Sequence, residues 1–256
     1  MRETGKFRPS DYGKWRFPAE DGIAARGGRV LTEYGLGVVI HIAAGVICLA
    51  SGAVALASRK DEILHRRAGV VFLTAACVMA VVAVVLAVLF RHWESVMAGL
   101  LMLYLVVTGW RAAAHTSGLA TPYDPWAAVF ALGIAILGIM LGGSAGMSAE
   151  GTLNGYPPEL YLVFGGMAGF GAVWDLTFLT YGRLSAKARI ARHLWRMCLA
   201  LTIAAAAFFL GQPEYFPPAL RGTLLLAIPP LATLVLMIFW FGRVWITDGF
   251  KEKDAS

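Results

Sequence analysis

Residues 41–69 read HIAAGVICLASGAVALASRKDEILHRRAG: an apolar run, a short charged segment and the start of a second apolar run. An α-helix rises about 1.5 Å per residue, so about 20 apolar residues cross a hydrocarbon core of about 30 Å. The charged segment between the two runs belongs in water rather than in lipid. This stretch therefore predicts two membrane-spanning helices joined by a short loop.

The same pattern continues along the chain. Of the 256 residues, 58% are hydrophobic and 15% are charged, and the mean hydropathy is +0.67, whereas a soluble domain is about 45–50% apolar and about 25% charged. Each span must satisfy its own backbone hydrogen bonds, so the spans are expected to be helices. Seven runs are long enough to span, at residues 34–57, 67–90, 95–114, 126–146, 159–181, 190–211 and 222–245. We predict an all-α, polytopic transmembrane bundle of seven spans.

Three parts of the chain follow from this assignment. Residues 1–32 form a polar N-terminal arm at the membrane interface, residues 33–247 the transmembrane domain, and residues 248–256 a cytoplasmic tail. The arm interleaves basic and aromatic residues, as in Lys14-Trp15-Arg16-Phe17. Such a segment either rests on lipid headgroups or docks on a membrane-protein partner.

The net charge is +6, and the basic residues outside the N-terminal arm gather on alternate loops. One side holds Arg59, Lys60, Arg66, Arg67, Arg111, Arg183, Lys187, Arg189, Arg192, Arg243, Lys251 and Lys253, and the opposite loops hold only Arg91 and Arg221. Cytoplasmic loops of membrane proteins are enriched in Lys and Arg. The charge therefore indicates loop orientation rather than nucleic-acid binding, with the N-terminus outside and the C-terminus in the cytoplasm.

Small residues recur at helix-packing spacing within several spans. Gly45, Cys48 and Gly52 share one face of the first span with His41, and pairs such as Gly138 with Gly142 and Gly165 with Gly169 mark the fourth and fifth spans. Such seams let helix backbones approach closely in lipid. A proline pair, Pro229-Pro230, is expected to kink the last span.

The chemistry-bearing residues concentrate at the basic end of the predicted bundle. Asp175 lies near the end of the fifth span, at a depth similar to His193 and Arg196 of the sixth. An aspartate inside the membrane needs a partner, so we predict that Asp175 contacts Arg196 or His193. The candidate ligand- or lipid-binding residues are Asp175, Arg192, His193, Arg196, Trp195, Arg111 and His115.

Two further histidines are candidates for haem or metal ligation. His41 lies about two turns inside the first span, and His65 lies at the start of the second. A hydrogen bond to a neighbouring helix is the alternative for His41. A bis-histidine haem needs two histidines at one depth on facing helices, and the deep histidines do not form such a pair. A b-type haem therefore remains a weakly supported cofactor.

Several function classes lack their signature residues. All lysines lie outside the predicted spans, which excludes a retinal Schiff base within a helix. Motifs for nucleophilic hydrolysis, zinc peptidases, phosphate loops or dinucleotides do not occur in a fitting context. The sequence thus provides no catalytic residue to name.

Short motifs nevertheless resemble one family. The combination of His41, Gly45 and Gly52 with His65-Arg66-Arg67-Ala68-Gly69 is similar to the DUF2306 family of uncharacterised bacterial membrane proteins. The stretch 192–197, RHLWRM, resembles the later part of such proteins. The chain departs from the family pattern after His65-Arg66, where the family has L-G-R-x-Y. The resemblance implies a helical protein of the bacterial inner membrane and brings no activity, substrate or catalytic residue.

These observations lead to three functional hypotheses. The first is a non-enzymatic inner-membrane protein that binds a lipid or an amphipathic ligand, or that serves as an accessory subunit of a membrane complex. The second is a redox protein with b-type haem or quinone. The third is a small-molecule transporter, which would need a water-filled path reaching His41.

Overall fold

The structure is a computed structural model, and it describes residues 35–59 and 62–247. Within these ranges seven helices are long and apolar enough to cross a membrane. They are α2 (Gly35–Ala57), α3 (Ile63–Phe90), α4 (Trp93–Ala114), α5 (Tyr123–Met147), α6 (Pro158–Tyr181), α7 (Ala186–Phe209) and α8 (Ile228–Ile246). The predicted all-α, seven-span transmembrane fold is confirmed. The N-terminal arm and the C-terminal tail lie outside the described residues.

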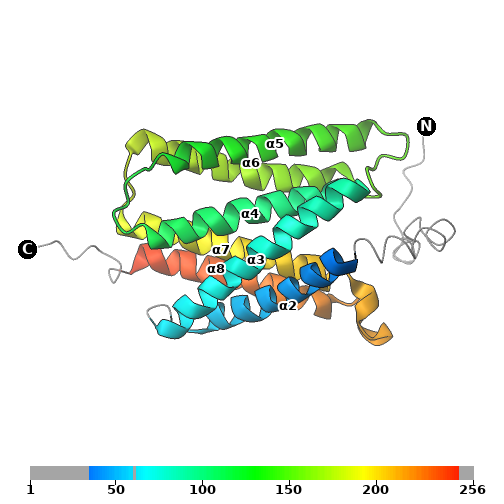
Figure 1. The fold of residues 1–256 in the computed structure, drawn as a ribbon, viewed down its shortest axis with the longest axis horizontal. Helices are drawn as coiled ribbons and strands as arrows, with labels where there is room; N and C mark the ends of the chain where they lie inside the picture. The colour runs from blue at the N-terminus through cyan, green and yellow to red at the C-terminus, as the bar shows by residue number, and fades with distance from the viewer. Residues whose placement is uncertain (1–34, 60–61, 248–256) are drawn as a thin grey trace, which may run out of the picture.

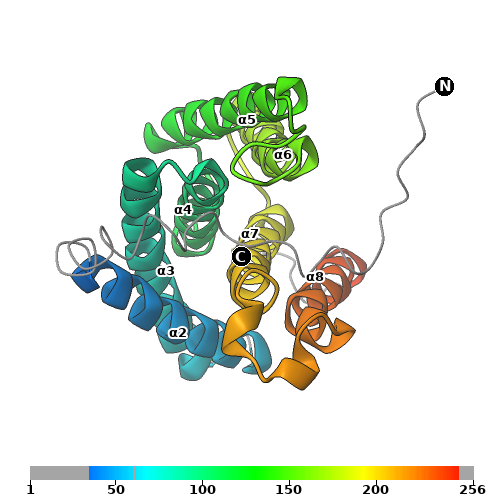
Figure 2. The same ribbon diagram turned by 90° about the vertical axis from the view of Figure 1, so that its right-hand side faces the viewer.

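The helices run up and down along one long axis (Figure 1). Figure 2 views the bundle along this axis and shows α4 and α7 in the middle, the pair α2 and α3 on one side and the pair α5 and α6 on another. α8 packs against α7. Because α4 and α7 contact neighbours on most sides, they are the most buried spans, whereas α2 and α8 expose most of their surface. The polar residues of a lipid-embedded bundle are therefore expected on α4 and α7.

Close contacts between helices use the small residues of the predicted seams. A Cβ atom at Gly138 of α5 would lie 2.6 Å from the Cα of Gly165 on α6, so the two backbones touch there. A Cβ at Gly52 of α2 would lie 2.6 Å from the side chain of Leu201 on α7. Apolar burial gives little drive for helix association in lipid, so close van der Waals packing must supply it.

The last span differs from the expectation of a kink at Pro229-Pro230. The span, Leu224–Ile246, begins with the 3₁₀-helix η4 (Leu224–Ala227), and the α-helix α8 starts at Ile228. The two prolines therefore lie in the first turn of α8. Their missing N–H groups cost no hydrogen bond in that turn. Two further 3₁₀-helices, η2 (Pro213–Tyr215) and η3 (Pro218–Leu220), precede this span.

Candidate functional site

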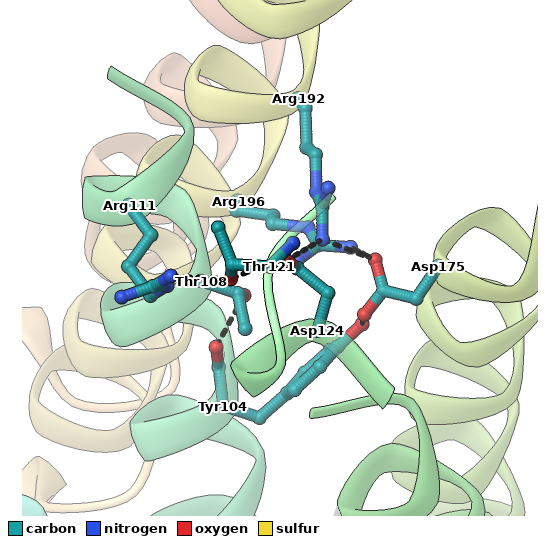
Figure 3. Close-up of polar contacts among 8 residues, drawn as sticks. All are labelled: Tyr104, Thr108, Arg111, Thr121, Asp124, Asp175, Arg192 and Arg196. Atoms are coloured by element: carbon teal, nitrogen blue, oxygen red, sulfur yellow. Dashed lines mark hydrogen bonds and ion pairs between the residues drawn. The ribbon is translucent and has the colours of Figure 1, made fainter. Parts of the chain in front are cut away.

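The centre of the candidate site is the carboxylate of Asp175, which is fully buried on α6. Its Oδ1 accepts hydrogen bonds from the Nη2 of Arg192, at 2.7 Å, and from the Nη2 of Arg196. Its Oδ2 accepts a hydrogen bond of 2.6 Å from the hydroxyl of Tyr104 on α4. One carboxylate thus joins α4, α6 and α7, as Figure 3 shows. The predicted contact between Asp175 and Arg196 is confirmed.

Arg196 is held by aromatic rings as well as by charge. It is fully buried, and its guanidinium carbon lies 5.0 Å from the ring centroid of Tyr104 and 5.0 Å from that of Trp195. Such cation–π contacts partly replace the water that a buried arginine gives up. Trp195 itself packs among Phe170 and Trp174 of α6, so it supports the cluster from the side.

A second aspartate extends the cluster toward the end of the bundle. Asp124, in the first turn of α5, lies 3.8 Å from the Nη2 of Arg192. Its Oδ2 accepts bonds of 2.7 Å from both the backbone N–H and the hydroxyl of Thr121. The Nη2 of Arg111 in turn donates to the Thr121 hydroxyl at 2.8 Å. This chain of contacts connects the buried centre to the end of α4 (Figure 3).

A cavity of about 30 Å³ lies beside Arg111 and Arg192 at this end of the bundle. That volume is enough for one or two small ligand atoms or waters. Its walls are formed by Thr108, Arg111, Ala112, His115, Gly118, Leu119, Thr121, Tyr123, Asp124, Phe178, Leu184, Arg189 and Arg192. The lining of the cavity therefore contains three arginines, at 111, 189 and 192, and one carboxylate, that of Asp124.

Two arginines that line the cavity each have one buried donor without an acceptor among the described residues. For the Nε atoms of Arg111 and Arg192, which are both buried, residues 35–59 and 62–247 supply no hydrogen-bond acceptor. Arg192 is only 3% exposed. A buried donor of a charged group without an acceptor is costly. Arg111 and Arg192 thus line the cavity, and each also keeps a buried donor without an acceptor among the described residues.

The loops at this end are fastened to each other and fix the cavity's shape. Leu184 donates from its N–H to the Gly118 carbonyl at 2.8 Å, and Ala120 donates to the Gly182 carbonyl at 2.9 Å. Gly118 has φ +67°, and a Cβ there would clash with the carbonyl oxygen of Leu184. Only glycine combines this left-handed backbone with so close an approach.

The histidines bind backbone carbonyls of neighbouring helices. The Nδ1 of His41 lies 3.0 Å from the Met79 oxygen, and that of His65 lies 2.9 Å from the Ala55 oxygen. Since His65 bonds at residue 55 of α2, fourteen residues from His41, the two histidines are about 21 Å apart along that helix. They do not share a ligand site. Each histidine instead joins α2 to α3. For His41, the predicted alternative of a hydrogen bond to a neighbouring helix is confirmed.

The remaining predicted site residues divide between the cluster and its margin. The Nδ1 of His193 lies 2.9 Å from the Gly109 oxygen, so this side chain contacts α4 rather than Asp175. Its ring lies edge-to-face with that of His65, with 6.4 Å between the centroids. His115 is exposed at the end of α4 and lines the cavity. In the described part of the chain, no three His, Cys, Asp or Glu side chains gather as a metal site.

Sequence reasoning missed three residues of the cluster: Tyr104, Thr121 and Asp124. The spacing Thr121-x-x-Asp124 before an apolar run matches a capping box, which predicts a helix start at this point. It does not predict that Asp124 also approaches Arg192. Tyr104 gives no signal at all, because the partner of a tyrosine in a span depends on which helices are neighbours.

Comparison of the chain with known protein families, with curated proteins and with solved structures finds no match. The function must therefore be argued from the geometry of the site. The resemblance to the DUF2306 family remains a prediction.

Proposed function

We propose that this integral membrane protein is a non-enzymatic receptor or carrier of an anionic amphipathic ligand, most simply an anionic membrane lipid. The observation that carries the proposal is a cavity lined by three arginines, at 111, 189 and 192, with their guanidinium N–H groups, and by one carboxylate, that of Asp124. Arginine binds phosphate and carboxylate oxygens through such N–H groups. Basic pockets between transmembrane helices bind lipid headgroups in this way.

The charge balance of the site supports an anion. Four arginines, at 111, 189, 192 and 196, oppose two aspartates, at 124 and 175, which leaves two positive charges near the cavity. Asp175 is already shared by Arg192 and Arg196. A phosphodiester would lower this excess, and its oxygens would accept from arginine N–H groups.

The position of the cavity along the bundle fits a headgroup. Arg111 lies one turn before the end of α4, and Asp124 lies in the first turn of α5. Both residues are therefore near the boundary between hydrocarbon and water. A lipid reaches this position laterally within the bilayer, whereas a free anion reaches it only from water.

Arg111→Gln is expected to weaken the binding of phosphatidylglycerol about tenfold. One charge-assisted hydrogen bond contributes about 1.5–3 kcal/mol, and about 1.4 kcal/mol is a factor of ten in affinity. The measurement is native mass spectrometry of purified protein titrated with phosphatidylglycerol. Arg67→Gln is the control, since Arg67 is an exposed arginine at the same end of the bundle and does not line the cavity.

Arg111→Lys separates charge from geometry, because lysine keeps the positive charge and lacks the planar fork of guanidinium N–H donors. We expect this variant to bind phosphatidylglycerol more weakly than the wild type does. An unchanged melting temperature would show that the variant is folded. Equal losses in Arg111→Gln and Arg67→Gln would contradict the proposed site, because they would show only a general attraction of basic residues to anionic lipid.

We further propose that the cavity end faces the cytoplasm of a bacterial cell. The support is the concentration of Arg and Lys at this end and their scarcity at the other. The test uses Ser117→Cys at the cavity end and Glu150→Cys at the opposite end, since both residues are exposed. A membrane-impermeant maleimide is expected to label Glu150→Cys in intact cells and Ser117→Cys only after permeabilisation. The reverse pattern would contradict this orientation.

A further inference from the structure

A groove between α4 and α5 runs beside the cavity and is open toward the surface of the bundle. Its volume is about 210 Å³, which exceeds the volume of an apolar cavity of about 150 Å³ that holds benzene. The walls are Leu103, Tyr104 and Val107 of α4 and Tyr123, Trp126, Ala127 and Phe130 of α5. All of these side chains are aromatic or aliphatic, so the groove suits a hydrocarbon chain.

The arrangement of the helices explains why a groove remains here. α5 packs along α6, and its contacts with α4 are far fewer. Figure 2 shows α5 and α6 side by side at one edge of the bundle, next to α4. Trp126 and Phe130 are 73% and 42% exposed at the margin of the groove. Lipid therefore has direct access to the space between α4 and α5.

The groove and the cavity meet at one residue. Tyr123 lines both, and the guanidinium carbon of Arg111 lies 4.1 Å from the centroid of its ring. From Tyr123 the groove continues along α5 to Phe130, about 10 Å deeper into the membrane. The apolar walls of the groove therefore extend from the cavity toward the middle of the membrane. This is the direction in which the acyl chains of a lipid run from its headgroup.

We propose that the groove holds one acyl chain of an anionic phospholipid whose phosphate lies at the cavity, with one or two of its oxygens inside, beside Arg111 and Arg192. This proposal rests on the proposed function and adds a second subsite: the place where an extended acyl chain of the lipid lies. Tyr104 forms part of the groove wall and is held by its hydrogen bond to Asp175. One residue of the wall is thereby fixed to the buried charge cluster.

The test is a pair of matched exchanges. Val107→Phe adds a ring inside the groove, and Val129→Phe places the same ring on the exposed face of α5, outside the groove. Each purified variant is titrated with dioleoyl phosphatidylglycerol and, separately, with glycerophosphoglycerol, which has the same headgroup and no acyl chains. We expect Val107→Phe to bind the full lipid at least tenfold more weakly and the headgroup unchanged, and Val129→Phe to bind both as the wild type does.

The outcomes separate this proposal from the one on which it rests. Equal lipid binding by Val107→Phe and Val129→Phe, together with a loss in Arg111→Gln, would overturn the chain site and leave the headgroup site standing. Equal binding by the wild type and Arg111→Gln would overturn both. Preference for a neutral isoprenoid quinone over phosphatidylglycerol would overturn the assignment of an anionic lipid.

A second measurement needs no variant. Wild-type protein is photolysed with a phosphatidylglycerol that carries a diazirine on its acyl chain, and the adducts are mapped by peptide mass spectrometry. We expect adducts concentrated on residues 103–107 and 123–130. Adducts spread evenly over the lipid-facing residues of α2, α3 and α8 would show annular lipid only and would overturn the proposal.

Discussion

Exchange of Asp175 for asparagine is expected to lower the free energy of unfolding by about 3 kcal/mol or more. Removal of one partner from a buried ion pair typically costs about 3–5 kcal/mol, because the remaining charge stays buried without compensation. Asparagine keeps the shape of the side chain, so the loss reports on charge rather than on packing. Arg192 retains Asp124 at 3.8 Å, whereas Arg196 loses its only carboxylate partner among the described residues.

The measurement is the melting temperature of the purified protein in detergent. Each kcal/mol corresponds to about 2–4 °C in a chain of 150–250 residues, so we expect a fall of roughly 10 °C. Glu150→Gln is the control, because Glu150 is exposed and its exchange removes the same negative charge.

The melting temperature of Tyr104→Phe is expected to lie between those of Asp175→Asn and Glu150→Gln. This exchange removes one hydrogen bond to Asp175 and leaves the ion pairs of Asp175 with Arg192 and Arg196.

A double variant shows whether the effect comes from the pair. Arg196→Met removes the buried charge that Asp175→Asn leaves behind, so the two exchanges together should cost less than the sum of the single exchanges. Additive losses would show that Asp175 and Arg196 stabilise the bundle independently. If Asp175→Asn and Glu150→Gln have the same melting temperature, the prediction that the buried cluster stabilises the protein is wrong.

The spans could be predicted from the sequence because lipid imposes a length and a polarity on each of them. Helix starts were less accurate: α3 begins at Ile63 rather than at residue 67, and α5 at Tyr123 rather than at residue 126. Both helices continue beyond the apolar run into polar residues, where hydrogen bonding of the backbone still favours helix. The earlier start of α5 matters, since it brings Tyr123 and Asp124 into the site.

The ion pair of Asp175 with Arg196 was also predictable, because consecutive spans are antiparallel and their residues can be placed at matching depths. The contact of Tyr104 with Asp175 was not, because depth alone does not state which of seven helices are neighbours. That information lies in the close packing of α4 against α6, where a Cβ at Gly171 would lie 2.6 Å from the Tyr104 hydroxyl. Small residues indicate that a face packs closely without indicating its partner.

Exchange of Gly138 for leucine is expected to have the second large effect, because it separates α5 from α6. A Cβ at this position would lie 2.6 Å from the Cα of Gly165 and 2.8 Å from the carbonyl oxygen of Tyr161. These are backbone atoms, which cannot rotate away as a side chain can. Overpacking typically costs about 1–3 kcal/mol and sometimes more, and we expect a loss near or above the upper value.

Gly133→Leu is the matched control on the same helix, since a Cβ there meets no atom within 4 Å. It should keep the melting temperature of the wild type, whereas Gly138→Leu should lower it by several degrees. Equal melting temperatures for the two variants would contradict direct contact between the backbones of α5 and α6.

The same pair of variants connects the seam to the site. α5 carries Asp124 and one wall of the groove, and α6 carries Asp175, so a displacement of one helix from the other moves both aspartates relative to Arg192. Gly138→Leu should therefore also weaken phosphatidylglycerol binding below the melting transition, and Gly133→Leu should not. Loss of stability with unchanged lipid binding would show that the site is held by α4 and α7 alone.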